Sequence, residues 1–199
     1  MTQASHDFQS YALSDRYDQT EGRVFLTGTQ ALVRIMFDQA RRDRDAGLNT
    51  GGFVSGYRGS PLGGLDLEFW RERDRTKEQN ITFMPAVNED LGATAVLGAQ
   101  QATLDPNCDV EGLFSMWYGK GPGVDRSGDA LKHGNAYGSS PKGGVLVVAG
   151  DDHGCVSPSV PHHSDAAFMY WFMPTPNPDS RADSPEFGGE GNRPRRCGG

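Results

Sequence analysis

Apolar and polar residues recur along this chain with two periods, one typical of helices and the other of buried strands. The first helical pattern follows Thr27, whose hydroxyl can cap a helix, and Gly47 indicates where it ends. Its expected apolar face consists of Ala31, Leu32, Ile35, Met36 and Ala40. Two further helical patterns cover 65–77 and 91–102, and short apolar runs predict strands at 52–55, 81–87, 110–117 and 145–149.

The order of these elements predicts an α/β fold with a mostly parallel sheet covered by helices. Strand and helix patterns alternate, which is the arrangement that joins parallel strands. Residues 145–149 are a continuous apolar run, typical of a central strand that is covered on both faces. Pro85 cannot donate to a hydrogen-bond ladder, so 81–87 is expected at an edge or to end early. A last short helix is expected near 168–173.

We expect one α/β domain at 21–178, preceded by an N-terminal extension at 1–20. A chain of 199 residues is long enough for one such domain with a substantial core. Residues 179–199 have almost no apolar side chains and cannot bury a face. Two explanations stay open for this segment, a disordered natural tail and a frameshifted or truncated gene product. The second is preferred because periodicity is lost inside an unfinished α/β unit, so the domain is expected to be incomplete.

The charge of the chain argues against nucleic acids and anionic membranes as partners. The formal net charge is −7 and both signs are interspersed, whereas proteins that bind nucleic acids or anionic membranes cluster their Lys and Arg. No segment has the roughly 20 apolar residues that span a bilayer or the apolar core of a signal peptide, so a cytoplasmic location is expected. Three scattered cysteines without a C-x-x-C pair predict neither a disulfide framework nor a zinc or iron–sulfur site in this chain.

Polar segments follow the predicted strands at 56–64, 88–90, 118–126 and 150–153. The carboxyl ends of parallel strands meet at one edge of a sheet, where ligands bind, so these segments predict one shared site. The third segment holds Lys120 and Arg126 among glycines, as a phosphate cradle would, but it is not a Walker loop, in which Ser or Thr follows the Lys. No stretch meets the Gly-x-Gly-x-x-Gly requirement of a dinucleotide-binding fold in the expected context either.

Five stretches resemble the N-terminal region of the indolepyruvate ferredoxin oxidoreductases: LTGTQALVR (26–34), GYRGSPLGG (56–64), NEDL (88–91), MWYGKGPGVDRSGD (116–129) and GDDH (150–153). The resemblance covers roughly residues 10–178. This family belongs to the thiamine-diphosphate-dependent 2-oxoacid:ferredoxin oxidoreductases. The resemblance implies a pyrimidine-binding domain of thiamine-enzyme type, which receives the aminopyrimidine end of the cofactor. It also implies that magnesium, the diphosphate and the iron–sulfur clusters bind to parts outside this chain.

Glu89 is the expected catalytic residue. Thiamine reacts when its exocyclic amine becomes an imine that takes the proton from the thiazolium C2, and a carboxyl group on the pyrimidine N1′ promotes that tautomer. By resemblance Glu89 is this carboxyl group, and its place after an apolar strand suits a water-poor pocket. The same resemblance assigns Gly59, Gly119 and Gly121 to the cofactor site. Without the resemblance, a helix N-terminal carboxylate that interacts with the macrodipole is the preferred interpretation of Glu89.

Four residues are expected beside the substrate. Arg58 and Ser60 can bind the carboxylate of a 2-oxo acid through a guanidinium and a hydroxyl, although Arg58 can equally pair with a neighbouring acid. Asp152 and His153 lie in the segment that the resemblance places near the active site. His153, which follows two aspartates, is also open to a role as a metal ligand or proton carrier, and without further evidence a structural role in a turn, satisfied by the nearby acids, is preferred.

The resemblance implies oxidative decarboxylation of an indolepyruvate-type 2-oxo acid to an acyl-CoA, with electrons passed to ferredoxin. Coenzyme A and ferredoxin are therefore expected partners of the complete enzyme, together with partner domains or further copies of the chain. This segment alone is expected to be inactive. A non-catalytic regulatory or interaction module with the same fold stays open as the alternative, because the diphosphate-binding half and the cluster cysteines lie outside the chain.

Overall fold

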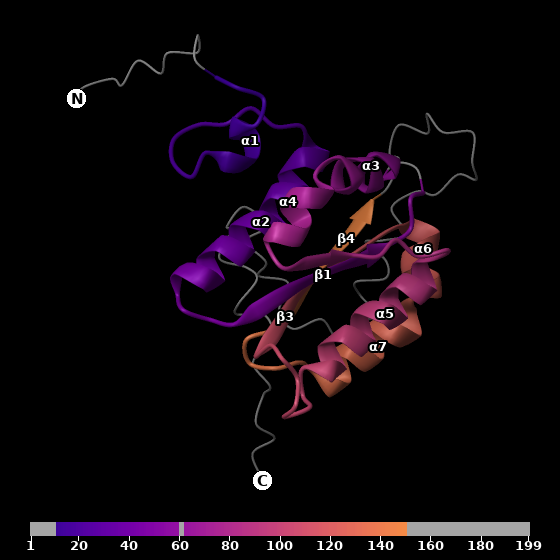
Figure 1. The fold of residues 1–199 in the computed structure, drawn as a ribbon. Coiled ribbons are helices and arrows are strands. Elements are labelled where there is room, and N and C mark those ends of the chain that lie inside the picture. The colour runs from indigo at the N-terminus through magenta and orange to yellow at the C-terminus, as the bar shows by residue number, and fades with distance from the viewer. Residues whose placement is uncertain (1–10, 60–61, 151–199) are drawn as a thin grey trace, which may run out of the picture.

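The computed structural model describes residues 11–59 and 62–150, which form a parallel sheet between two layers of helices (Figure 1). The sheet has four strands in the order β2-β1-β3-β4, and each neighbouring pair is parallel. The strands are β1 (Thr50–Gly56), β2 (Ile81–Phe83), β3 (Gly112–Lys120) and β4 (Gly144–Gly150). The predicted α/β fold with a parallel sheet is confirmed. The helix expected near 168–173 and the segment 179–199 lie outside the described residues.

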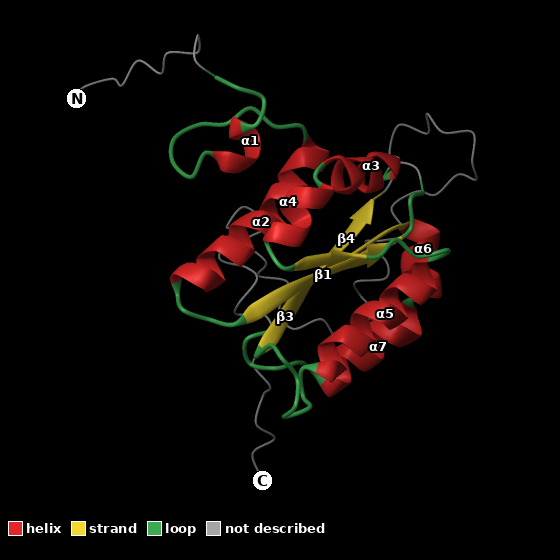
Figure 2. Cartoon of the chain, viewed as in Figure 1, coloured by secondary structure: helices red, strands yellow, loops and turns green. Residues whose placement is uncertain are grey.

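Helices from the two halves of the described chain cover opposite faces of the sheet (Figure 2). The first layer contains α1 (Asp15–Asp18), α2 (Gly28–Asp45), α3 (Gly63–Arg71) and α4 (Arg73–Glu78). The second layer contains α5 (Glu89–Ala102), α6 (Gly121–Arg126) and α7 (Gly128–Tyr137). Residues 65–77, expected as one helix, fall in α3 and α4, which meet at Glu72.

Side chains of β3 contribute to the cores on both faces of the sheet. Phe114, Met116 and Tyr118 lie in the larger core with residues of α2 and α3. Trp117 lies in the smaller core with residues of α5, α6 and α7. Successive side chains of a strand project to opposite faces, so a strand that is covered twice requires apolar residues at nearly every position.

The first predicted helix is confirmed as α2, with both ends where the sequence indicates. The Thr27 hydroxyl accepts from the backbone N–H of Gln30, and the Gln30 side chain accepts from the backbone N–H of Thr27, which forms a capping box. Gly47 follows the last turn with a φ of +72°, a conformation that favours glycine. The expected apolar face is partly wrong, because Ile35 is 42% exposed while Phe37 is buried.

Of the two strands at the edges of the described sheet, β2 has its predicted position and β4 does not. β2 ends at Phe83, two residues before Pro85, and it lies at an edge of the described sheet, as predicted. β4 forms the other edge of the described sheet and most of its residues are half-buried, so the predicted central position is wrong for the described residues. An apolar run indicates that both faces of a strand are covered, but it does not reveal how many neighbouring strands are present.

The glycine-rich segment 118–126 is not the loop that its composition predicts. β3 continues to Lys120, and α6 and α7 follow with only Ser127 between them. Pro122 lies in the first turn of α6, where a helix needs no backbone N–H from it. The expectation of a loop is therefore wrong for 121–126, where a short helix follows the strand directly.

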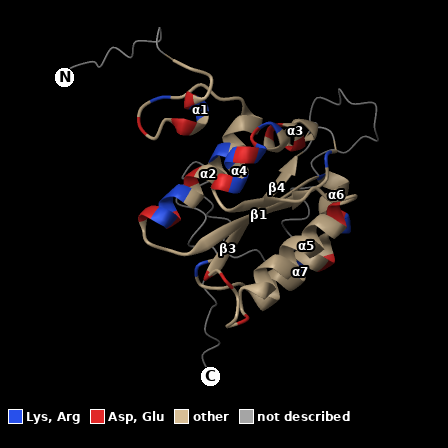
Figure 3. Ribbon diagram, in the orientation of Figure 1, with Lys and Arg blue, Asp and Glu red and all other residues tan. Residues whose placement is uncertain are grey.

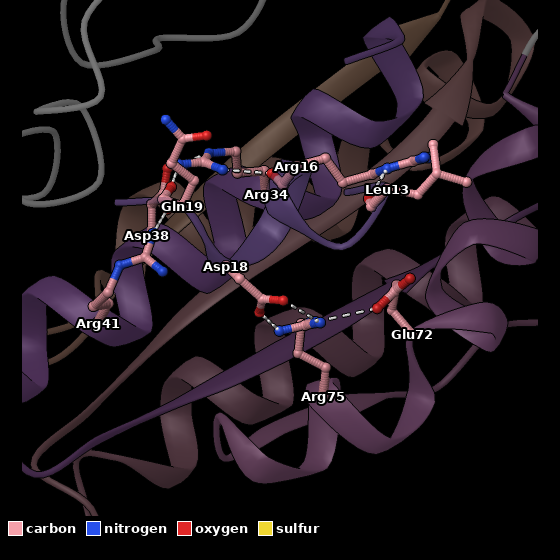
Figure 4. A network of polar contacts seen from close by, with 9 residues as sticks. All are labelled: Leu13, Arg16, Asp18, Gln19, Arg34, Asp38, Arg41, Glu72 and Arg75. Carbon is pink, nitrogen blue, oxygen red and sulfur yellow. Dashed lines mark hydrogen bonds and ion pairs between the residues drawn. The ribbon is translucent and has the colours of Figure 1, made fainter. Parts of the chain in front are cut away.

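The first described residues, part of the predicted extension, pack against the domain. Tyr17 is 2% exposed within the larger core, and its hydroxyl donates to Glu68 at 2.7 Å. Figure 4 shows the polar contacts around this segment: Arg34 of α2 donates to two of its backbone carbonyls, and Arg75 of α4 pairs with Asp18. A buried aromatic side chain, the Arg75–Asp18 ion pair and several hydrogen bonds therefore hold the segment to the first helical layer.

Charged side chains are distributed unequally between the two helical layers (Figure 3). Lys, Arg, Asp and Glu are frequent on α2 and α4, whereas Glu89 and Asp90 in the first turn are the charged residues of α5. Within the described ranges, no helix has both the length and the apolar character needed to cross a membrane.

Candidate functional site

The β1–α3 connection lies across the carboxyl ends of β3 and β4. A Cβ atom built on Gly59 would be 3.5 Å from Cδ of Lys120, the last residue of β3. A Cβ atom built on Gly150, the last residue of β4, would be only 2.6 Å from Cγ of Leu62. The polar segments that follow β1 and β3 therefore meet at one edge, as predicted. Ser60, Asp152 and His153 lie outside the described residues.

The backbone of Glu89 is held in place from two sides. Asn88 is the N-cap of α5, and its Oδ1 accepts from the backbone N–H of Leu91 at 2.8 Å. The indole Nε1 of Trp117 donates to the carbonyl of Glu89 at 2.9 Å. Because Trp117 is fully buried in β3, this hydrogen bond is shielded from water and connects the start of α5 to the sheet.

The side chain of Glu89 is buried between two glycines at the edge. Glu89 is only 4% exposed. A Cβ atom built on Gly119 would lie 3.0 Å from Cγ of Glu89, and one built on Gly123 would lie 2.2 Å from it. The structure therefore brings Gly119 and Glu89 together. Gly121 is the buried first residue of α6, whereas Gly59 lies in the β1–α3 connection.

Arg126, the last residue of α6, is the charged partner of Glu89. Its Nη1 lies 3.2 Å from Oε2 of Glu89. The side chain of Arg126 is 57% exposed, so a buried carboxylate is paired with a largely solvated guanidinium. Without such a partner, a buried carboxylate would be an uncompensated charge and would destabilise the fold.

The sequence does not predict Gly123 or Arg126 as part of the Glu89 site. Residues 118–126 are expected to form a loop, and Arg126 is considered there only for a phosphate cradle, which the missing Walker pattern argues against. The two positions are three residues apart, so on a helix they lie on the same face. In α6 both of them contact Glu89. A helix prediction for 121–126 is the signal that could have identified them.

A second polar cluster lies near the same edge, on the face of the larger core. The hydroxyl of Tyr118 donates to Oδ1 of Asp66 at 2.5 Å, and both side chains are buried. Burial raises the pKa of Asp66, while the hydrogen bond from Tyr118 and the positive charge of Arg58 offset part of that rise. Burial also raises the pKa of the Tyr118 phenol above its ordinary range. Asp66 is thus an acid whose charge interacts with that of Arg58.

An open groove of about 310 Å³ lies elsewhere, between the first described residues and α3 and α4. Its lining includes Arg71 and Arg75, which already pair with Glu68 and Glu72. These charges compensate one another, and none of the predicted site residues lines the groove. The edge that contains Glu89 is therefore the better candidate site.

In residues 11–59 and 62–150, no group of three or more His, Cys, Asp or Glu side chains is arranged to hold a metal ion.

Comparison of the chain with family models, curated proteins and solved structures gives no match. The functional assignment therefore depends on the geometry around Glu89 and on the sequence motifs.

Proposed function

We propose that this chain is the aminopyrimidine-binding domain of a thiamine-diphosphate-dependent 2-oxoacid:ferredoxin oxidoreductase of the indolepyruvate type. The observation that carries the proposal is the burial of Glu89 between Gly119 and Gly123 at the carboxyl edge of a parallel sheet. A carboxyl group in a water-poor setting is what the pyrimidine N1′ requires. The stretches that resemble the family contain Glu89 and both glycines.

The residues around Glu89 fit an aminopyrimidine ring in their chemistry. Glu89 supplies the carboxyl group for the ring nitrogen. Gly119 and Gly123 have no side chains, which allows the side chain of Glu89 to pack directly against their backbone. Val124 and Trp117, both buried in the smaller core, supply apolar surroundings that exclude water. The buried carboxyl group and its apolar surroundings support binding of the aminopyrimidine end of the cofactor.

Each residue of the site has a distinct role in the proposed reaction. When bound, thiamine diphosphate supplies a nucleophilic carbon at C2 of its thiazolium ring. Glu89 holds a proton at the pyrimidine N1′, and burial keeps water away from that proton. Asn88 and Trp117 keep the backbone of Glu89 in position through the cap and the indole hydrogen bond. Arg58, together with Ser60, binds the carboxylate of the 2-oxo acid.

The proposed reaction needs groups that other chains or domains supply. Partner domains or further copies hold magnesium, the diphosphate and the iron–sulfur clusters, and coenzyme A and ferredoxin are the further reactants, in the cytoplasm. Large apolar side chains are exposed on α3, after β2 and at the start of α5, and they support a partner surface: Leu67, Trp70, Met84, Val87 and Leu91. The low charge of α5 agrees with the same surface (Figure 3).

That surface also favours a second candidate, a non-catalytic interaction module that retains the fold. Such a module needs an apolar surface for its partner but no cofactor. The two candidates differ in one measurable respect, because only the first predicts that partner domains restore thiamine-dependent turnover.

Substitution of Glu89 tests the proposed function. In a complex with the domains that hold the diphosphate, Glu89→Gln should reduce the turnover of an aryl 2-oxo acid by orders of magnitude, because an amide cannot share a proton with N1′. It should also weaken thiamine binding by about tenfold or more, since hydrogen bonds to charged groups contribute about 1.5–3 kcal/mol. Stopped-assay kinetics and saturation-transfer NMR of the aminopyrimidine protons measure the two effects.

Asp90→Asn is the matched control, because Asp90 lies in the same first turn of α5 and interacts with the same helix dipole. It should leave both turnover and thiamine binding near the wild-type values. Near-wild-type turnover in the Glu89→Gln complex would contradict the proposal, as would equal losses in the two variants.

A further inference from the structure

Glu89 is not accessible to a ligand in the described conformation. A ring nitrogen must come within about 2.7–3.2 Å of a carboxylate oxygen to form a hydrogen bond. The backbone of Gly123 lies against Cγ of Glu89, and Arg126 lies 3.2 Å from Oε2. With Glu89 only 4% exposed, α6 occupies the side from which a ligand would approach.

Of α5 and α6, which meet at Glu89, α6 is the helix that can move when a ligand binds. The cap of Asn88 and the hydrogen bond from Trp117 hold the start of α5. α6 has six residues, and no side-chain hydrogen bond caps its N-terminus at Lys120. At its other end, the Ser127 hydroxyl is buried without a hydrogen-bond partner among the described residues, a cost that a shift of α6 can relieve.

We propose that Arg126 and the aminopyrimidine ring compete for the carboxylate of Glu89. Arg126 neutralises Glu89 in the ligand-free chain, and ligand binding moves the end of α6 outward and releases the guanidinium into solvent. That release costs little desolvation, because the Arg126 side chain is already 57% exposed. The inference rests on the proposed function and adds that the Glu89–Arg126 pair sets the affinity of the site. Arg126 is thus a positioning residue that acts through Glu89.

Calorimetric titration of the full chain with 4-amino-5-(hydroxymethyl)-2-methylpyrimidine tests the competition. This probe is the aminopyrimidine half of thiamine without the cationic ring, so a change in net charge affects its binding little. Arg126→Gln should bind it about two- to fivefold more tightly than the wild type, the range that a largely exposed ion pair can contribute. Arg126→Lys keeps the charge and should fall between the wild type and the Gln variant.

Arg73→Gln is the matched control for the loss of one positive charge. Arg73 lies on α4, its side chain is 68% exposed, and its ion-pair partner is Asp74 rather than Glu89. The control should bind the probe with the affinity of the wild type.

The salt dependence of binding is a second test that needs no variant. Raising NaCl from about 50 to 500 mM screens an exposed ion pair such as Glu89–Arg126. The affinity of the wild type for the neutral probe should therefore increase with salt.

The outcomes separate this inference from the proposed function. If the wild type binds the probe but Arg126→Gln binds it equally or more weakly, the inference is overturned and the proposed function stands. If Arg126→Gln does not fold, a wild-type affinity that stays constant or decreases with salt overturns the inference in the same way. If none of the chains binds the probe, the proposed function is overturned and the inference falls with it.

Discussion

Glu89 and Asp66 are two buried acids near one edge of the sheet, and their surroundings accommodate them differently. Glu89 has a charged partner in Arg126, whereas Asp66 accepts a hydrogen bond from the neutral phenol of Tyr118. The hydrogen bond satisfies one oxygen of Asp66, but it does not offset the desolvation of the charged form. The protonation of Asp66 is therefore linked to the stability of the fold.

Asp66→Asn should become relatively more stable as the pH rises. Because the pKa of Asp66 is raised in the folded chain, its contribution to stability is full below the unfolded pKa of about 4 and is lost as the pH rises through the folded pKa. Asn can still accept the hydrogen bond from Tyr118 but does not titrate. The free energy of unfolding of the variant minus that of the wild type should therefore increase between pH 4 and 7 in urea titrations.

Glu111→Gln is the control of opposite sign. The hydrogen bond from Lys142, followed by that from the backbone of Asn49, lowers the pKa of Glu111. A lowered folded pKa contributes stability above the unfolded pKa that is lost as the pH falls. The free energy of unfolding of Glu111→Gln minus that of the wild type should therefore decrease as the pH rises. A constant or falling difference for Asp66→Asn would contradict the assignment of Asp66 as a destabilised carboxylate.

The packing of α5 on the sheet depends on one of its two interior glycines. A Cβ atom built on Gly92 would lie 3.0 Å from Cα of Gly56 in β1, and the backbone cannot rotate away as a side chain could. A Cβ atom built on Gly98 would meet nothing within 4 Å. The same residue type in the same helix therefore has a packing role at one position and none at the other.

Alanine substitutions at these two glycines should have opposite effects. Gly92→Ala should lower the free energy of unfolding by about 1–3 kcal/mol through overpacking. Gly98→Ala should raise it by about 0.5–1 kcal/mol, because alanine has the higher helix propensity. Urea unfolding of both variants measures the difference, and a stable Gly92→Ala chain would show that α5 is not packed tightly on β1.

Local signals account for the elements that were predicted correctly. The hydroxyl of Thr27, the φ of Gly47 and the missing N–H of Pro85 act on their immediate neighbours, so a short stretch of sequence reveals them. The sequence does not predict the helix α6, because glycine and proline disfavour helices intrinsically. In the folded chain, packing against Glu89 and the smaller core overrides that preference at Gly123 and Val124.

The strand order predicts a gradient of backbone protection across the sheet. Within the described sheet, β1 and β3 each have two neighbouring strands, whereas β2 has three residues and one neighbour. Amides of β1 and β3 should therefore exchange with deuterium orders of magnitude more slowly than those of β2, because their opening requires disruption of the sheet on both sides. Hydrogen exchange followed by mass spectrometry measures this gradient, and equal protection of β2 and β3 would contradict the strand order.

Patterns in the sequence predict the class of the fold, most of the helices and strands, and the place of Glu89 at the start of a helix after a strand. These features follow from residue periodicity and from caps that act over a few positions. Only tertiary packing places β4 at an edge of the described sheet, exposes Ile35 and pairs Glu89 with Arg126. Glu89 and Arg126 are 37 positions apart and meet because α5 and α6 pack on one face of the sheet, and no local pattern encodes a contact of that range.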